Sequence, residues 1–171
     1  MAATKRRLPV LQPKDDEGES RPPWQWTAIG GATTMLVLLP LAMATAWLAR
    51  HTYGSYVHGA TPAELQQSVE ALTAGQRIWL SLLSVVAPIF SLAVASVAGG
   101  ALVGRFGGAA GKREAALGAV LAAAVSSAIA ARGFIAAPGG AVLWLFTSVV
   151  MFVVSGAMGL LGGVAGLRLR R

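Results

Sequence analysis

The sequence predicts an all-α, polytopic membrane protein with four transmembrane helices in a bundle. Of its 171 residues, 55% are hydrophobic and only 12% are charged, whereas a soluble domain carries about 25% charged residues. The apolar residues gather in four long runs, and the charged residues stand near the ends of these runs or between them. Segregation of this kind is typical of chains that cross a lipid bilayer.

The chain opens with a polar segment, residues 1–26. It holds a basic cluster around Arg6, an acidic cluster around Asp16 and four prolines. Such a segment buries too little apolar surface to offset the entropy lost on folding, so we expect a disordered cytoplasmic tail. A cleaved signal peptide is the alternative, because Ala42-Met43-Ala44 has the small residues of a cleavage site. The apolar run around it is about 23 residues long, however, against about 7–15 for a signal core.

Each apolar run is long enough to cross a bilayer as a helix, since about 20 residues span roughly 30 Å of hydrocarbon. The third run is the weakest, because Ala115–Ala131 consists largely of alanine. It extends further only if Arg132 reaches the interface with its long side chain. The predicted spans cover residues 27–49, 78–104, 114–136 and 141–167.

The positions of the basic residues decide between three and four spans. With four spans, eleven Lys and Arg lie on one side and three on the other, as the excess of basic residues in cytoplasmic segments requires. With three spans, the loop around Lys112 and the C-terminal arginines would lie on opposite sides. We therefore predict four spans with both termini in the cytoplasm. The net charge of +7 then reflects orientation and does not indicate a nucleic-acid partner.

A short amphipathic helix is predicted in the outer loop, over residues 62–73. Thr61 and Glu64 have the spacing of a capping box, and apolar residues recur at helical spacing from Leu65 onward. Gly75 is placed to end this helix. We expect the helix to lie on the outer face of the bundle or at the lipid interface. A docking site for a partner is the alternative.

The predicted spans offer little for catalysis or coupled transport. Apart from residues at their ends they contain no ionisable group, whereas proton relays and substrate sites in membranes depend on such groups. The chain also has no cysteine, which excludes disulfides and thiolate chemistry. His51 and His58 in the outer loop are two imidazoles without further ligands nearby, too few for a metal site. We predict no catalytic residue, no cofactor and no metal.

Small residues recur at every fourth position in three of the spans. Such stripes let helix backbones approach closely in lipid, where apolar burial gives no driving force between helices. They can pack within one molecule or between copies, and both readings stay open. The predicted packing residues are Ser96, Gly100, Gly104, Gly118, Ala122, Ser126, Ser155, Gly159 and Gly163.

Basic residues in the loop between the second and third spans are candidates for contacts with anionic lipid head groups. They are Arg105, Lys112 and Arg113. Their simpler role is to orient the chain during insertion.

The glycine-rich stretches ASVAGGALVGRFGGAAGKREAALGAVLAA and GAMGLLGGVAGLRLRR, with their basic flanks, resemble small four-span bacterial membrane proteins of the YrzE-like type. The resemblance covers residues 78–171, and the long charged N-terminal tail departs from it. It implies the architecture and no activity. Arginine in excess over lysine and the absence of asparagine are associated with GC-rich bacterial genomes. We therefore expect the chain in a bacterial plasma membrane.

Two functions are compatible with the sequence. The first is a non-enzymatic structural or accessory subunit, packed through its small-residue faces against itself, a second copy or another membrane protein. The second is a passive channel or small-solute transporter, formed by oligomers and lined by serine and threonine. The two differ in whether the span hydroxyls converge on a cavity or are used in contacts between helices.

Overall fold

The computed structural model describes residues 22–59, 61–108, 110–135 and 139–170, of which 133–135 are described by their backbone alone. These residues form helices and connecting turns and contain no strand. The helices are α1 Pro23–Tyr56, α2 Pro62–Glu70, α3 Ala74–Phe106, α4 Lys112–Ile135 and α5 Gly140–Leu169.

Four of these helices, α1, α3, α4 and α5, are long and apolar enough to cross a membrane. Each contains one of the predicted apolar runs, so the prediction of an all-helical chain with four long apolar helices is confirmed. In the weakest run the part that qualifies is Lys112–Arg132. The predicted tail lies mostly outside the described residues, as does residue 136.

The ends of α1 differ from the prediction. The helix begins at Pro23, four residues before Thr27, because proline fixes φ near its helical value and its missing N–H is not needed in the first turn. It continues to Tyr56, seven residues beyond Ala49. No proline occurs between residues 40 and 62, so nothing in this segment forces the helix to stop earlier.

The outer helix α2 is shorter than predicted. Its capping box is present, with the Glu64 N–H donating to the Thr61 hydroxyl and the Thr61 N–H to the Glu64 carboxylate. The helix ends at Glu70 because Thr73 caps the next helix: the Gln76 N–H donates to the Thr73 hydroxyl over 3.3 Å. Gly75 therefore lies in the first turn of α3, and the prediction that it ends the outer helix is wrong.

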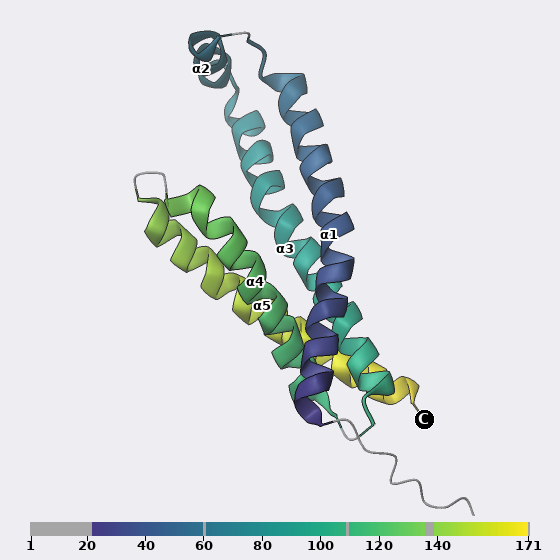
Figure 1. The fold of residues 1–171 in the computed structure, drawn as a ribbon. Helices are drawn as coiled ribbons and strands as arrows, with labels where there is room; N and C mark the ends of the chain where they lie inside the picture. Colours follow the sequence, from purple (N-terminus) through teal and green to yellow (C-terminus); the bar gives the residue numbers. More distant parts are fainter. Residues whose placement is uncertain (1–21, 60, 109, 136–138, 171) are drawn as a thin grey trace, which may run out of the picture.

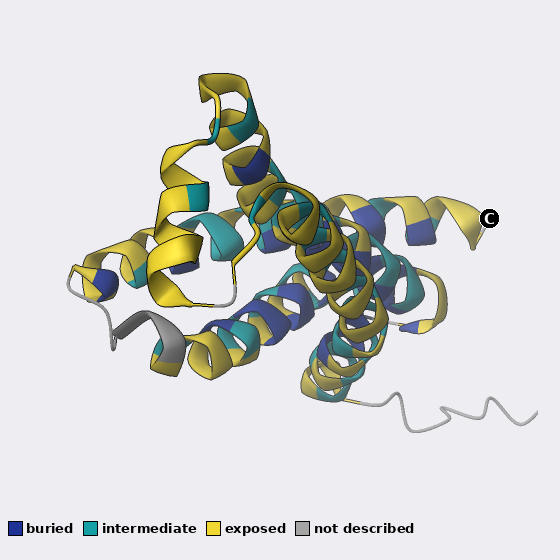
Figure 2. Ribbon diagram, turned by 90° about the horizontal axis from the view of Figure 1, so that it is seen from above, coloured by how far each residue is buried: buried dark blue, intermediate teal, exposed yellow. Residues whose placement is uncertain are grey.

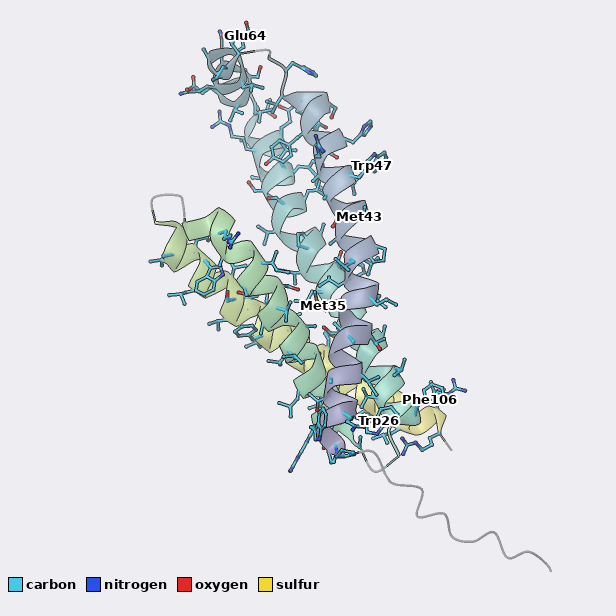
Figure 3. All side chains as sticks on the ribbon, in the orientation of Figure 1. Trp26, Met35, Met43, Trp47, Glu64 and Phe106 are labelled. Atoms are coloured by element: carbon cyan, nitrogen blue, oxygen red, sulfur yellow. The ribbon has the colours of Figure 1, made fainter. Side chains whose placement is uncertain are left out.

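The outer helix does not cover the bundle. Figure 1 shows α2 at the tip of the hairpin formed by α1 and α3, beyond the ends of α4 and α5. None of its residues is buried. Figure 3 likewise places Glu64 at this tip, with side chains projecting into open space.

The four long helices form two antiparallel pairs, α1 with α3 and α4 with α5 (Figure 1). The pairs meet at the end where α1 and α4 begin and where α3 and α5 end, which we call the closed end. Towards the other end, the open end, they diverge. The space between the diverging pairs is called the fork below.

The core consists of small side chains. The largest fully buried residues are only Leu92, Val103, Thr34, Ser96 and Ser155. Figure 2 shows the buried positions on the helix sides that face one another and the exposed positions on the outer sides. A core this thin requires close approach of the backbones, because dispersion contacts weaken steeply with separation.

Candidate functional site

The small-residue stripe of α3 packs directly on α5. A methyl group added at Gly100 would overlap the carbonyl oxygen of Gly159, and one added at Gly104 would overlap that of Gly163. The backbones of the two helices are therefore in van der Waals contact at these positions. Four predicted packing residues belong to this face: Ser96, Gly100 and Gly104 of α3 and Ser155 of α5. Gly159 and Gly163 contact α3 with their backbones, but a Cβ on them would overlap Ala119 and Ala115 of α4, so their stripe packs on α4.

Two further glycines of α5 make the contact reciprocal. A Cβ at Gly162 would overlap the carbonyl oxygen of Val97, and a Cβ at Gly166 would overlap that of Ala101. Close approach thus continues over more than one turn of each helix, from Ser96 on α3 to its last turns. Contact of this length between backbones stabilises the packing of α3 on α5, which has no large interlocking side chains.

A buried hydroxyl group joins three helices at this face. The Ser155 hydroxyl lies 3.0 Å from the Ser96 hydroxyl on α3 and donates to the carbonyl oxygen of Ala119 on α4 over 2.6 Å. Both serines are fully buried. A hydroxyl in an apolar environment must be hydrogen-bonded, so these bonds fix how α3, α4 and α5 meet.

The stripe of α4 faces α1 instead. A Cβ at Gly118 would lie 2.8 Å from the carbonyl oxygen of Thr27 and 2.9 Å from the backbone nitrogen of Gly31. The Ser126 hydroxyl donates to the carbonyl oxygen of Ala122 over 2.9 Å and lies 3.6 Å from the sulfur of Met35. Figure 3 shows Met35 on the side of α1 that is turned towards α4.

The sequence prediction missed the matching face of α1. Gly30, Gly31 and Thr34 are buried there, and the Thr34 hydroxyl donates to the carbonyl oxygen of Gly30 over 2.8 Å. A Cβ at Gly99 on α3 would overlap this hydroxyl, so Thr34 lies between α1 and α3. The spacing of Gly30, Gly31 and Thr34 is itself a small-residue pattern and was the available signal.

In the half of the molecule towards the open end, the hydrogen bonds that the described residues make between two of the long helices join α4 to α5. The hydroxyls of Ser127 and Ser148 bond to each other, and the indole N–H of Trp144 donates to the carbonyl oxygen of Ser127 over 3.0 Å. On α3, the Ser91 hydroxyl donates to Ala87 within its own helix. No buried side-chain nitrogen or oxygen in the described ranges lacks a hydrogen-bond partner.

The three basic candidates lie at the closed end and are exposed to solvent. The Arg105 guanidinium stands 5.4 Å from the ring centre of Phe106, whose position at this end is visible in Figure 3. The Arg170 side chain reaches back from α5 and donates to the carbonyl oxygens of Arg105 and Gly108. Lys112 and Arg113 begin α4 and are also exposed, so cations from three helices gather at one end.

The two histidines are not brought together into a site. His51 stacks on Trp47 with ring centres 5.5 Å apart and planes 6° from parallel. The backbone carbonyl of His58 accepts a hydrogen bond from Ser68. Within the described parts of the chain, no three residues of the types His, Cys, Asp and Glu are grouped closely enough to hold a metal ion.

No protein-family model, no curated protein and no solved structure matches this chain.

Proposed function

We propose that the chain is a non-enzymatic integral protein of a bacterial plasma membrane, with a structural or accessory role and both termini in the cytoplasm. Four long apolar helices support its place in a membrane. The closed end, with five exposed cations among its described residues and Glu114 as the one acid there, fits the cytoplasmic side. Arg105, Lys112 and Arg113 then face the anionic head groups of that leaflet.

The observation that carries this proposal is the use of the buried hydroxyls. Two pairs of serine hydroxyls form hydrogen bonds between helices: Ser96 with Ser155, and Ser127 with Ser148. Ser91 and Ser126 bond to their own helices. A hydroxyl engaged in this way does not line a path for water or a solute, so the arrangement favours a packed framework over a passive channel.

The small-residue faces also limit how a partner could bind. The space beside Gly100, Gly104, Gly159 and Gly163 is already occupied by other helices of the same molecule. A second copy or another membrane protein would therefore meet the apolar side chains that remain exposed, such as Leu36 and Phe90. In this proposal the glycines shape the subunit and the outer surfaces contact the partner.

Flux through liposomes distinguishes the accessory role from a channel. The purified full chain is reconstituted into vesicles, and the entry of water and of small neutral solutes is compared with protein-free vesicles. We expect no added flux. Flux that scales with the amount of protein and is lost in Ser127→Val or Ser155→Val, with folding retained, would overturn the proposal. Cross-linking in native membranes then tests for a stable partner, whose recovery supports the accessory role.

A further inference from the structure

The fork is lined on both sides by apolar side chains that continue the packing faces of the closed end. Ile89 and Val85 stand seven and eleven residues before Ser96 and hence on the same side of α3. Val125 and Ile129 extend, in the same way, the side of α4 that Gly118 presents to α1. Near the closed end these faces touch a neighbouring helix, whereas in the fork they do not: Val85 is 57% and Ile129 70% exposed.

One hollow lies in the fork, and a second lies on α4 beside it. One, of about 380 Å³, lies between α3 and the α4–α5 pair, and its lining includes Ile89, Ala130, Leu143, Thr147 and Met151. The other, of about 450 Å³, follows α4 along Val125, Ala128, Ile129 and Arg132. The first is almost wholly apolar, and the second ends at a cation.

Arg132 stands at the height of a membrane interface. It follows Lys112 by twenty residues of continuous helix, which is about 30 Å of rise and equals the thickness of the hydrocarbon core. With Lys112 at one interface, Arg132 lies near the opposite boundary of the hydrocarbon core, from which its long side chain extends towards the head groups. It is exposed. The acidic residues among the described parts of the chain are Glu114, about 27 Å away along the same helix, and Glu64 and Glu70 of α2 at the tip of the other helix pair.

Both hollows are open to the surroundings of the bundle, and in a bilayer these surroundings are lipid chains. An acyl chain is a single file of methylene groups and fits both, while an apolar groove with a cation at its mouth matches an anionic lipid.

We propose that the fork binds an anionic phospholipid of the leaflet at the open end, with its phosphate on Arg132 and its acyl chains in the two hollows. This site is separate from the basic closed end, which lies at the other side of the bilayer. The inference requires that the chain span a membrane but is independent of whether it serves as an accessory subunit.

A photoreactive lipid tests the site. The full chain is reconstituted with phosphatidylglycerol that carries a diazirine in the acyl chain, and the labelled residues are mapped by mass spectrometry. We expect labelling to concentrate on Ile89, Ile129 and Leu143 in the fork, several-fold above the exposed Leu36 and Val153. A zwitterionic analogue with the same diazirine should label both groups alike.

Substitutions test the contribution of the Arg132 side chain and that of the apolar hollow separately. Arg132→Ala should lower fork labelling several-fold and Arg132→Lys should retain it, while Arg50→Ala, which removes another exposed arginine towards the open end, should leave it unchanged. Ala130→Phe fills the hollow between α3 and α5 and should also reduce labelling, with helix content monitored by circular dichroism. Uniform labelling, equal labelling by the zwitterionic lipid, or unchanged labelling in Arg132→Ala would overturn the proposal. Cross-linking of a second copy through a cysteine placed at Ala130 would do the same.

Discussion

The hydroxyls of Ser96 and Ser155 lie 3.0 Å apart in the core, at the end of the close contact between α3 and α5 nearest the fork. Beyond this pair, towards the open end, α3 presents Ile89 and Val85 to the fork. The two serines therefore lie where the backbone contact between α3 and α5 ends. One turn further towards the open end Leu92 is still fully buried, and beyond it the helix pairs diverge.

Replacing Ser155 by alanine should destabilise the bundle. The change removes the bonds to Ser96 and to the carbonyl oxygen of Ala119, and hydrogen bonds between membrane helices contribute about 0.6–2 kcal/mol each. The free energy of unfolding, measured by titration with a denaturing detergent, should fall by that order. Ser84→Ala is the control, because Ser84 is exposed and donates only to Ser81 in its own helix. Equal effects of the two changes would contradict the assignment.

A methyl group at Gly100 should cost more than one at Gly54. The first overlaps the carbonyl oxygen of Gly159, whereas a Cβ at Gly54 meets no atom within 4 Å. Gly100→Ala should lower the free energy of unfolding by about 1–3 kcal/mol, as overpacking does. Gly54→Ala should raise it by about 0.5–1 kcal/mol, because alanine loses less backbone entropy in a helix. The opposite ranking in detergent unfolding would show that α3 and α5 are not in backbone contact.

Removal of the Arg170 side chain should loosen the last turn of α3. Its guanidinium donates to the carbonyl oxygens of Arg105 and Gly108 over 3.1 and 2.7 Å, which have few other partners at a helix end. In Arg170→Ala, amide hydrogen exchange should be faster in the segment from Val103 to Gly108 and unchanged in α2. The matched control is Arg168→Ala in the same turn of α5. If both variants exchange alike, the effect is one of net charge and not of these bonds.

Reporter fusions test the orientation. Fusions at residues 10, 109 and 171 should report a cytoplasmic position, and fusions at residues 65 and 138 an external one, because the basic residues concentrate on the first side. Enzymatic reporters active on only one side of the membrane give the readout. An external signal at 109 or 171 would eliminate the four-span arrangement with cytoplasmic ends.

The long helices were predictable from the sequence because each is an uninterrupted apolar run. The boundary at Thr73 was misjudged, since Gly75 was taken as a helix end although Thr73 and Gln76 carry the spacing of a second capping box. The local sequence was compatible with a helix end at Gly75 or with a helix start at Thr73. The hydrogen bonds at Thr73 favour the start of α3.

The pairing of the stripes was beyond sequence reasoning. Small residues at every fourth position show that a face can pack closely, but Gly100 and Gly118 carry the same pattern and meet different helices, α5 and α1. The fork was equally hidden, because Ile89 in the fork and Phe90 on the outside are both apolar. Hydropathy separates lipid from water and does not separate a lipid-facing side chain from one that faces another helix.

The divergence of the two helix pairs gives the molecule a different cross-section at each end (Figure 1). In a bilayer, a body of this shape takes up more lateral area in the leaflet at the open end than in the leaflet at the closed end. Lipids in the two leaflets would then be displaced unequally. The chain would therefore be more stable in a membrane that is concave on the side of the closed end. Bilayer curvature would thereby favour a larger or a smaller angle between the two helix pairs.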